Sequence, residues 1–366
     1  MEITRRLSSF VLKQHNVKIF ICLLLLFLVN IVLQLSANDG VPRAVLSDIF
    51  YAIIGLTTYL LLNQQRYYWF SHISTPLYLI SIILLILVFF VGTKVNGAQR
   101  WLSLGIKIQP SEIAKFVVPL FITVFLQKRS NNGFLELSTV DYLLALLLIL
   151  IPTLLILKQP DLGTACLVFL SGFLVLIYLG IPKKIIIYGI ILFTLASPLI
   201  WHGLKDYQKY RIMTLLHPKT DNRGKGYHVM QGKIAIGSGG LWGKGYLKGS
   251  QVHLSFVPEK NTDFIVAVLA EEFGFVGIVF VLAIYLFLLR EFLLIAQNTE
   301  DMYYKALVLG ITMSIAIDIF VNLAMVTGLV PVVGVPLPLI SHGGTSAMIM
   351  VMSIAIVSSI GLKNMR

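Results

Sequence analysis

Long apolar runs recur along this chain, and they limit its possible folds more than any other feature. A helix that crosses a bilayer needs roughly 20 apolar residues. The chain contains ten such runs; 57% of its 366 residues are hydrophobic, 13% are charged, and its mean hydropathy is +0.86. The sequence therefore predicts an all-α, polytopic membrane protein with about ten transmembrane helices: Ile19–Leu35, Ser47–Leu62, Thr75–Gly92, Ser111–Leu126, Tyr142–Leu157, Gly163–Ile181, Ile185–Trp201, Phe264–Leu289, Ala306–Gly328 and Leu339–Leu362.

The uneven distribution of lysine and arginine between the short loops predicts the orientation of the chain. With a cytoplasmic N-terminus, the outside loops hold only Arg43, Lys94, Arg100, Lys107 and Lys158. Ten spans then leave both termini cytoplasmic and make 202–262 a large extracytoplasmic loop within a single integral membrane domain, 1–366. The segments expected on the cytoplasmic side hold thirteen basic residues: Arg5, Arg6, Lys13, Lys18, Arg66, Lys128, Arg129, Lys183, Lys184, Arg290, Lys305, Lys363 and Arg366.

The first apolar run follows basic residues, as a cleaved secretory signal would. It is longer than the roughly 7–15 apolar residues of such a signal, so we interpret it as an uncleaved first span. Cys22 and Cys166 both fall within predicted spans. The sequence therefore implies neither a disulfide nor a cysteine metal cluster.

The formal net charge of +12 argues only weakly for a nucleic-acid partner, because the positive-inside distribution explains much of it. One excess remains. The loop 202–262 carries ten basic residues against Asp206, Asp221 and Glu259. Two interpretations stay open: a solvated loop beside anionic membrane lipids, or a site for an anionic, lipid-borne substrate on the outer face.

Within that loop, DYQKYRIMTLLHP has a helical spacing of apolar residues and is expected to lie along the membrane surface. The glycine-rich IGSGGLWGKG that follows matches neither the phosphate-binding loop nor the dinucleotide fingerprint. This argues against ATP or NAD binding. The glycines are expected to let the backbone approach a ligand or form a re-entrant turn.

Several charged residues lie inside or at the ends of predicted spans, where an ion is costly unless it has a partner or faces a cavity. Glu112 and Lys115 are three residues apart and share a helix face, so they form either a local ion pair or a polar cavity wall. Arg100 lies beside Trp101 in the preceding loop. Asp161 begins the sixth span, where a helix cap is the simple alternative.

The eighth span begins near Asp263, where a helix N-terminus favours an ionised carboxylate and where capping is again the alternative role. Glu271 and Glu272 lie deeper in that span, and at least one is expected to face a polar interior. In the ninth span Asp318 and Asn322 share one face. His342 opens the last span and is more often a structural hydrogen-bonder than a catalyst in such a place.

Six motifs occur in order between Gly97 and Gly344: GAQRWLSLG, QPSEIAK, QPDLGT, GYHVMQGKIAIGSGGLWGKG, NTDFIVAVLAEEFG and PVVGVPLPLISHGG. Together they resemble the SEDS family (shape, elongation, division and sporulation). PVVGVPLPL and GYHVMQ are similar to the elongation branch rather than the division branch. Three positions depart from the family pattern: Asn261 stands where histidine is common, His342 where tyrosine is common, and Asp318 is an unexpected acid.

The resemblance implies the ten-helix SEDS fold in the cytoplasmic (inner) membrane. It also implies a peptidoglycan glycosyltransferase that polymerises lipid II into undecaprenyl-diphosphate-linked glycan during elongation. The expected partner is a class B penicillin-binding transpeptidase of the elongation machinery. The catalytic aspartate of the family falls on Asp263, and its cavity residues fall on Glu112, Lys115 and Asp161.

The chemistry itself asks for a base and for groups that stabilise a diphosphate. An α-linked donor becomes a β-linked polymer, so the anomeric carbon inverts, and one base must take the proton of the acceptor hydroxyl. Asp263 fits the base. The candidates for substrate contact are Arg100, Lys115, Lys233 and Lys244, with Glu271 as the acid of the polar interior.

A divalent cation such as Mg²⁺ or Mn²⁺ would help the leaving group, although the sequence shows no metal-ligand pattern. Two other classes of protein remain as alternatives. One is a flippase for lipid-linked precursors, and the other is a non-catalytic scaffold for the transpeptidase. A carboxylate placed for chemistry on the outer face favours the enzyme.

Overall fold

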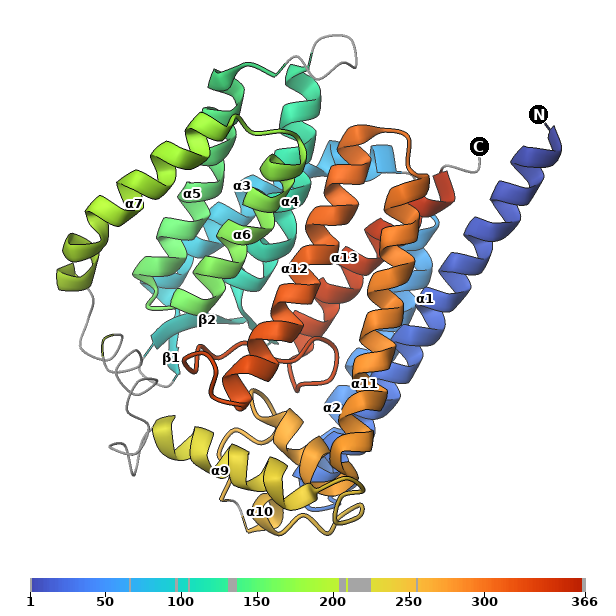
Figure 1. The fold of residues 1–366 in the computed structure, drawn as a ribbon, viewed down its shortest axis with the longest axis vertical. Coiled ribbons are helices and arrows are strands. Elements are labelled where there is room, and N and C mark those ends of the chain that lie inside the picture. The colour runs from blue at the N-terminus through green and yellow to red at the C-terminus, as the bar shows by residue number, and fades with distance from the viewer. Residues whose placement is uncertain are drawn as a thin grey trace.

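The structure is a computed structural model that describes residues 2–65, 67–95, 98–104, 106–130, 137–203, 209, 225–254 and 256–363. Its helices form an elongated bundle with both termini toward the same end (Figure 1). The described helices are α1 (Glu2–Ala37), α2 (Pro42–Asn63), α3 (Tyr67–Val91), α4 (Pro110–Arg129), α5 (Thr139–Lys158), α6 (Leu162–Tyr178), α7 (Lys183–Gly203), α9 (Lys225–Gly239), α10 (Ser250–His253), α11 (Ile265–Asn298), α12 (Met302–Val326) and α13 (Gly344–Lys363).

Each predicted span overlaps one long helix: α1 to α7, α11, α12 and α13. Within the described residues, eight of these helices are long and apolar enough to cross a membrane. Of the other two, α6 is apolar but shorter, with 17 residues, and α7 has 21. The predicted polytopic, helical membrane fold is confirmed.

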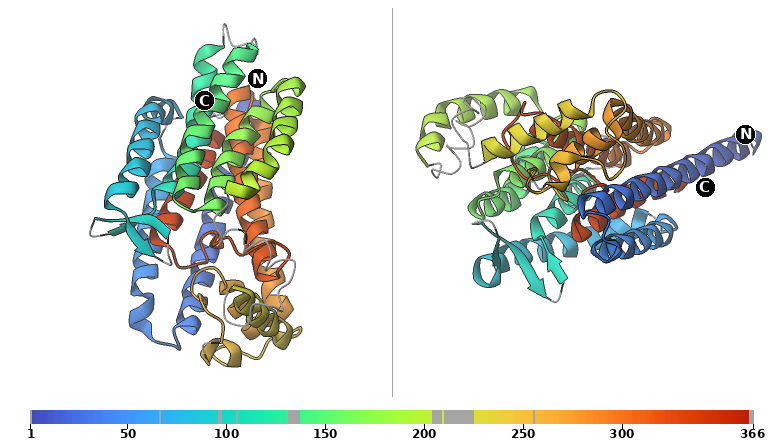
Figure 2. Two further views of the ribbon diagram at one scale, coloured as in Figure 1. Left: turned by 90° about the vertical axis from the view of Figure 1, so that its left-hand side faces the viewer. Right: turned by 90° about the horizontal axis from the view of Figure 1, so that it is seen from below.

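The centre of the bundle is built from α4, α12 and α13. α4 packs against α3, α5, α6 and α12, whereas α13 packs against α1, α2 and α11. In the most apolar stretch of α4, 83% of the residues are buried inside the protein, whereas the corresponding share is 28% for α2 and for α3. The outer helices therefore turn much of their apolar surface outward, as expected for contact with lipid; two further views show the arrangement (Figure 2).

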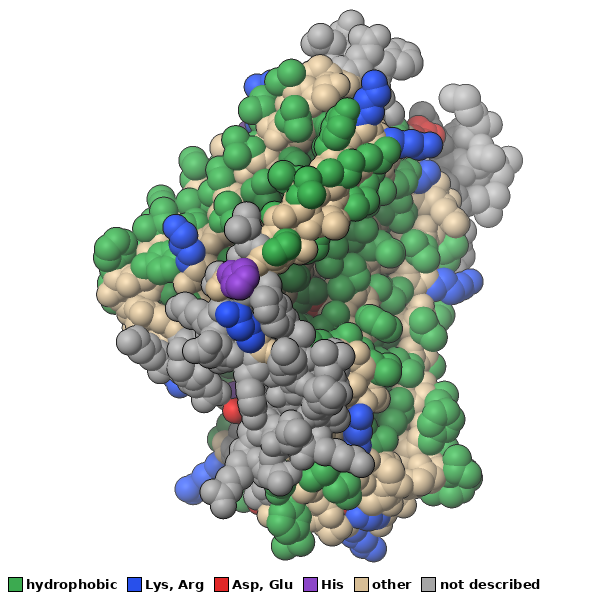
Figure 3. Space-filling model, turned by 60° about the vertical axis from the view of Figure 1, so that its left-hand side comes forward, with side chains coloured by type: hydrophobic (Ala, Val, Ile, Leu, Met, Phe, Trp, Pro, Cys, Tyr) green, Lys and Arg blue, Asp and Glu red, His purple; other side chains and the backbone are tan. Residues whose placement is uncertain are grey.

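α7 lies apart from this packing and is exposed along most of its described length. In Figure 1 it runs along the flank of the bundle beside α5 and α6. Hydrophobic side chains make up most of the described surface on this flank, and few acidic side chains are visible (Figure 3). An exposed apolar surface of this kind is suited to a bilayer rather than to water.

A small antiparallel sheet interrupts the helical chain before α4. Its strands are β1 (Thr93–Val95), β2 (Ala98–Leu104) and β3 (Ile106–Ile108), in the order β1-β2-β3. From the sequence, this segment was expected to be a loop. Asn96-Gly97 stands between β1 and β2 in the sequence, and an Asn-Gly pair between short strands is a strong hairpin signal. The sheet leads directly into Pro110 at the start of α4.

The described part of the loop 202–262 contains two helices, α9 and α10, at the end of the bundle away from the termini (Figure 1). α9 packs closely on α11: a Cβ atom added to Gly239 would lie 1.9 Å from the main-chain oxygen of Ala270. The stretch DYQKYRIMTLLHP, predicted to lie along the membrane surface, is outside the described residues apart from Lys209.

Near its start α11 is broken at Gly274, whose φ of 65° and ψ of −162° are not helical. A break frees main-chain groups that must find other partners inside a protein. The glycine-rich loop supplies them. The main-chain N–H groups of Lys244 and Gly245 donate to the main-chain oxygens of Glu271 and Glu272 at 2.9 and 3.0 Å. The main-chain N–H of Phe275 donates to the main-chain oxygen of Gly240 at 2.9 Å.

Several helix boundaries differ from those predicted: α1 begins at Glu2 rather than Ile19 and α3 at Tyr67 rather than Thr75, for example. α11 continues to Asn298 instead of ending at Leu289, because the apolar run alone does not mark where a helix leaves the membrane. α13 begins at Gly344 rather than Leu339. Leu339 has a φ of +63°, outside the helical region, and prolines at 336 and 338 cannot supply main-chain donors to a helix.

Candidate active-site cavity

A cavity of about 520 Å³ opens where α2, α4 and α13 meet the loop before α11. Asp263 and Glu112 both line it, although they are far apart in the sequence. It lies toward the end of the bundle that carries the sheet, because β3 and the first turn of α4 contribute to its wall. Its other lining residues that matter below are Tyr51, Trp101, Lys107, Gln109 and His342.

Asp263 lies just before α11, and its position is fixed mainly through the main chain. Asn322 of α12 donates its side-chain amide to the main-chain oxygens of Asp263 at 3.1 Å and Val335 at 2.7 Å. The N-cap of α11 is Phe264, without a side-chain cap hydrogen bond. Asp263 therefore does not occupy the N-cap position, and its half-buried side chain lines the cavity.

The loop that carries Asp263 is held from several sides. Gln34 of α1 donates to the main-chain oxygen of Asn261 at 2.8 Å, and the main-chain N–H of His342 donates to the same oxygen at 2.9 Å. The hydroxyl of Ser341 donates to the main-chain oxygen of Thr262 at 2.6 Å. Support of this kind keeps a reactive group in one geometry.

Of the two alternatives for Glu112 and Lys115, the ion pair is present, and Glu112 also lines the cavity. The Lys115 Nζ lies 3.1 Å from Glu112 and 2.9 Å from Asp318 of α12, and all three side chains are buried. Ser346 of α13 donates to the same Glu112 oxygen at 3.1 Å. Glu112 thus joins the cavity to a buried charged cluster, which we call the α4–α12 cluster: Glu112, Lys115 and Asp318.

Asp161 caps α6, since it accepts a hydrogen bond from Thr164 N at 3.3 Å. It also pairs with Arg100 of β2, with 3.3 Å between Nη1 and Oδ2. Gln109, which lines the cavity, donates to the same carboxylate at 3.3 Å. Asp161 and Arg100 are therefore behind the cavity wall rather than on it.

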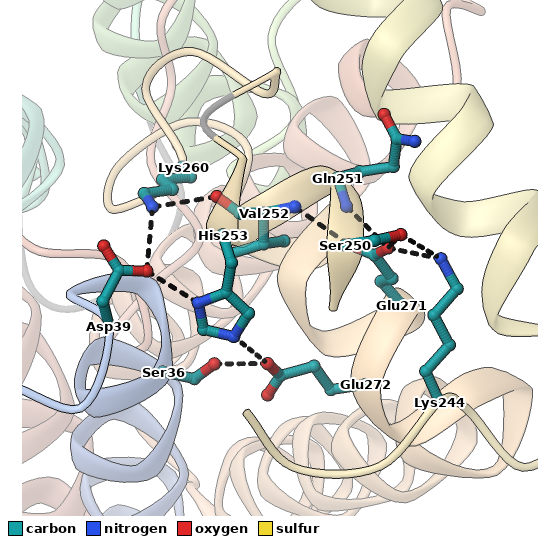
Figure 4. A network of polar contacts seen from close by, with 10 residues as sticks. All are labelled: Ser36, Asp39, Lys244, Ser250, Gln251, Val252, His253, Lys260, Glu271 and Glu272. Atoms are coloured by element: carbon teal, nitrogen blue, oxygen red, sulfur yellow. Dashed lines mark hydrogen bonds and ion pairs between the residues drawn. The ribbon is translucent and has the colours of Figure 1, made fainter. Parts of the chain in front are cut away.

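Lys244 and Glu271 lie in a different polar network, at the break in α11 (Figure 4). The Nζ of Lys244 is 2.6 Å from Glu271, and Glu271 also accepts the main-chain N–H groups of Gln251 at 2.9 Å and Val252 at 3.1 Å. These bonds fix α10 against α11. Neither residue lines the cavity, so their predicted contact with substrate stays a prediction.

Glu272 belongs to the other half of that network. Ser36 of α1 donates to it, and His253 Nε2 lies 3.6 Å from it. The other ring nitrogen of His253 is 2.6 Å from Asp39, and this hydrogen bond is the main reason why the pKa of Asp39 is lowered. The expectation of a polar surrounding is thus met for both glutamates of α11, by protein groups.

Lys233 is an exposed residue of α9, away from the cavity lining. Its side chain crosses the end of α12: a Cβ atom on Gly328 would lie 2.7 Å from the Lys233 Nζ. Gly328 has a φ of +69° and no side chain, and both properties permit this approach. Of the predicted substrate-binding residues, only Glu112 lines the 520 Å³ cavity directly.

Two residues of the site were not named from the sequence, Asp48 and the cavity-lining Tyr51, and the cavity-lining Lys107 was counted only among the outside basic residues. The carboxylate of Asp48 is behind the wall, 2.9 Å from Nδ1 of His342, so His342 makes a side-chain hydrogen bond within the protein, and its role stays a prediction. This hydrogen bond raises the pKa of His342. No local sequence pattern identifies Asp48, because its partner His342 is 294 positions away in the sequence.

The sequence suggested that a divalent cation would help the leaving group. Among the described residues no group of three or more His, Cys, Asp or Glu side chains is arranged to hold a metal ion. Glu112 is already engaged by Lys115 and Ser346. The described side chains of the cavity therefore do not form a dedicated cation site.

The fold and the cavity define a polytopic membrane protein with a buried polar site and a carboxylate held on its wall. The chain also matches, over residues 8–365, the family described as cell cycle proteins FtsW, RodA and SpoVE. This match covers almost the whole length, and the chain therefore belongs to that family, which is the SEDS family.

Particular relatives narrow the comparison. The chain is 47% identical over 286 residues to the peptidoglycan glycosyltransferase MrdB of Escherichia coli K12, covering 78% of this chain and 76% of MrdB. It is similar to the crystal structure of the rod shape determining protein RodA of Thermus thermophilus, with a TM-score of 0.69, 27% identity and coverage of 94% and 95% of the two chains.

A second solved structure is described as the structural coordination of polymerization and crosslinking by a peptidoglycan synthase complex. It matches with a TM-score of 0.76 and 28% identity, covering 93% of this chain and 97% of that chain. These similarities confirm the resemblance to the elongation branch.

Proposed function

We propose that this chain is a peptidoglycan glycosyltransferase that polymerises lipid II during cell elongation and the maintenance of rod shape. One observation carries the proposal: Asp263 and Glu112 line the same 520 Å³ cavity in a chain of this family. The cavity has the size of a small-molecule site. The similar proteins named above as peptidoglycan glycosyltransferases support the reaction class.

The proposed reaction is a single displacement at the anomeric carbon of the donor. Asp263 takes the proton of the acceptor's sugar hydroxyl while that oxygen forms the new glycosidic bond. The bond between the anomeric carbon and the diphosphate oxygen breaks, and the isoprenoid diphosphate leaves with the bonding electrons. A general base of this kind contributes typically about 10²- to 10⁴-fold. Attack from the opposite face inverts the carbon.

The charged surroundings of Asp263 fit this role. Glu112 has its counterion in Lys115, 3.1 Å away, so it is engaged in a fixed pair. Asp263 has its main chain anchored by Asn322, and the residue lines the cavity. We assign Asp263 as the base and the α4–α12 cluster as part of the substrate-binding wall. Arg100 and Asp161 support that wall through Gln109.

We place the cavity on the extracytoplasmic side of the cytoplasmic membrane and both termini in the cytoplasm. The lysine and arginine distribution supports this orientation. The chain is then one integral membrane domain, 1–366, and 202–262 is its large outer loop. In that orientation the substrate reaches the cavity from the outer leaflet.

The proposed partner is a class B penicillin-binding transpeptidase of the elongation machinery. The solved structure described as a peptidoglycan synthase complex, which coordinates polymerization with crosslinking, supports this pairing. Coupling of the two activities would deliver new glycan strands directly to a crosslinking enzyme. Copurification with the cognate transpeptidase, and a faster polymerisation rate when the two are paired, are the results expected of such a complex.

The decisive experiment compares lipid II polymerisation by the purified parent and by Asp263→Asn, each with the transpeptidase partner. The variant keeps the size of the side chain but cannot accept a proton, so its rate should fall by at least about 10²-fold. Lipid II binding and the melting curve should stay close to those of the parent. A precursor flippase or a scaffold would make no polymer at all, and near-parental polymerisation by the variant would place the base elsewhere.

A further inference from the structure

The cavity poses a problem of charge for the proposed substrate. Lipid II carries a diphosphate, and Asp263 and Glu112 bring two carboxylates to the wall that it must approach. Anions in a partly buried site need a compensating cation or a set of hydrogen-bond donors. The basic residues predicted for this purpose do not line the cavity.

Three of those four residues are engaged in ion pairs elsewhere in the described structure, and the fourth, Lys233, is exposed on α9. Arg100 pairs with Asp161, Lys244 pairs with Glu271, and Lys115 is shared between Glu112 and Asp318. Of the described residues that line the cavity, Lys107 and His342 are the ones that can carry a positive charge. Lys107 is an exposed residue of β3, and its charge is at the end of a long, flexible side chain.

His342 is held differently. Its Nδ1 lies 2.9 and 3.1 Å from the two oxygens of Asp48 on α2, and Asp48 is only 6% exposed whereas His342 is 44% exposed. The ring is therefore oriented by a buried carboxylate while it faces the cavity. With Nδ1 bound to Asp48, Nε2 is the ring nitrogen that an anionic ligand in the cavity would meet.

The neighbouring backbone favours the same ligand. His342 lies two residues before the start of α13, and Gly343, Gly344, Thr345 and Ser346 also line the cavity. The first N–H groups of a helix lack partners within the helix and carry a partial positive charge. A Cβ atom on Gly344 would lie 2.2 Å from the Tyr51 ring, so this close approach of α2 to the helix start requires glycine.

We propose that His342, positioned by Asp48, is a substrate-binding residue that holds the diphosphate of the lipid-linked donor at the start of α13. The inference rests on the proposed function. It adds a specificity-determining contact at a position where the family resemblance leads one to expect tyrosine. A cation beside the diphosphate would also stabilise the negative charge that develops on the leaving group.

The proposal makes binding depend on pH in a defined direction. The hydrogen bond to Asp48 raises the pKa of His342, so the imidazolium persists to higher pH than for an ordinary histidine. Binding should be strongest below that pKa and should weaken as the pH rises through it. The diphosphate of lipid II is esterified at both ends, so it does not titrate near neutral pH.

The other titratable groups that face His342 come from each surrounding element. They are Asp48 and Tyr51 of α2, Lys107 of β3, Glu112 of α4 and Asp263 before α11. His342→Gln distinguishes the imidazole from these groups, because a midpoint that belongs to the imidazole disappears in that variant.

The test measures the Kd for lipid II between pH 6 and 9, on purified parent, His342→Gln, His342→Lys and Asp48→Asn, with a melting curve for each. His342→Gln should bind about tenfold or more weakly at pH 6, and its Kd should no longer change with pH. His342→Lys keeps a charge, so it should bind across the whole range. Asp48→Asn should move the midpoint to lower pH.

Parental affinity and pH profile in folded His342→Gln, or an unmoved midpoint in Asp48→Asn, would overturn the inference. If His342→Gln does not fold, His342→Lys and Asp48→Asn decide the question by the same criteria. Polymerisation by the parent is recorded in parallel. A parent that makes polymer while these variants bind normally refutes only the role of His342, whereas a parent that makes none refutes the proposed function.

Discussion

Asn322 of α12 lies with its side-chain amide 3.1 Å from the main-chain oxygen of Asp263. The same amide donates to Val335 at 2.7 Å, and the Asn322 side chain is fully buried. One buried residue thus fastens the candidate base and the segment before α13 to the central helices. The relationship suggests that the geometry of the cavity depends on residues that no substrate touches.

The first prediction tests this anchoring. Asn322→Ala removes one buried and one partly buried hydrogen bond and should lower the free energy of unfolding by roughly 1–3 kcal/mol. It should also lower kcat by about tenfold to a hundredfold, since a misplacement of about 1 Å can cost about 10² in rate. The measurements are a melting curve and the polymerisation rate at saturating lipid II.

A matched control is Tyr78→Phe, which removes one buried hydrogen bond, to the main-chain oxygen of Leu148 at 2.7 Å, away from the cavity. It should lower stability by about 1 kcal/mol with kcat unchanged. Parental kcat in folded Asn322→Ala would show that the anchoring does not serve catalysis.

The second prediction concerns the α4–α12 cluster. Lys115→Met leaves Glu112 and Asp318 buried without their shared cation and should destabilise the fold by about 3–5 kcal/mol. Adding Asp318→Asn removes one of the stranded charges, so the double variant should recover part of the loss. Melting curves of the parent, both single variants and the double variant give the coupling. Strictly additive effects would contradict a shared ion pair.

The third prediction concerns the break in α11. A Cβ atom on Gly243 would lie 2.1 Å from the main-chain oxygen of Glu272, and the φ of Gly243 is +76°. Gly243→Ala should therefore destabilise the fold by more than about 1 kcal/mol, through backbone strain and displacement of the loop from α11.

Gly237 of α9 provides the matched control for that change, because a Cβ atom added there meets nothing within 4 Å. Gly237→Ala should be neutral or stabilise by up to about 1 kcal/mol, as expected for alanine in a helix. Equal melting temperatures for the two variants would mean that the loop does not complete the broken helix.

The fourth prediction tests the orientation of the bundle. Trp242 is 80% exposed at the end of the bundle that carries α9, and Lys128 lies near the other end, in the last turn of α4. In a background without Cys22 and Cys166, Trp242→Cys should react with an impermeant thiol reagent added outside cells. Lys128→Cys should react only after the membrane is opened. The reverse pattern would place the cavity on the cytoplasmic side.

The sequence by itself determined what depends on neighbours along the chain. Spans follow from the length of apolar runs, the Glu112–Lys115 pair from a spacing of three residues on a helix, and the cap at Asp161 from its place at a helix start. Each of these is a local interaction, so the residues that form it stand close together in the sequence. The hairpin signal of Asn96-Gly97 is local as well and was available without the structure.

Only the tertiary structure decided which helix faces meet. Asp318 joins Lys115 across 203 positions, and Asp48 reaches His342 across 294. In a membrane protein nearly every helix is apolar on all sides, so the hydrophobic pattern does not indicate which face is turned inward. That packing also decides which residues pair with Lys244 and Glu271. It brings the glycine-rich loop to the break in α11, where the two form main-chain hydrogen bonds. The cavity follows from the same contacts.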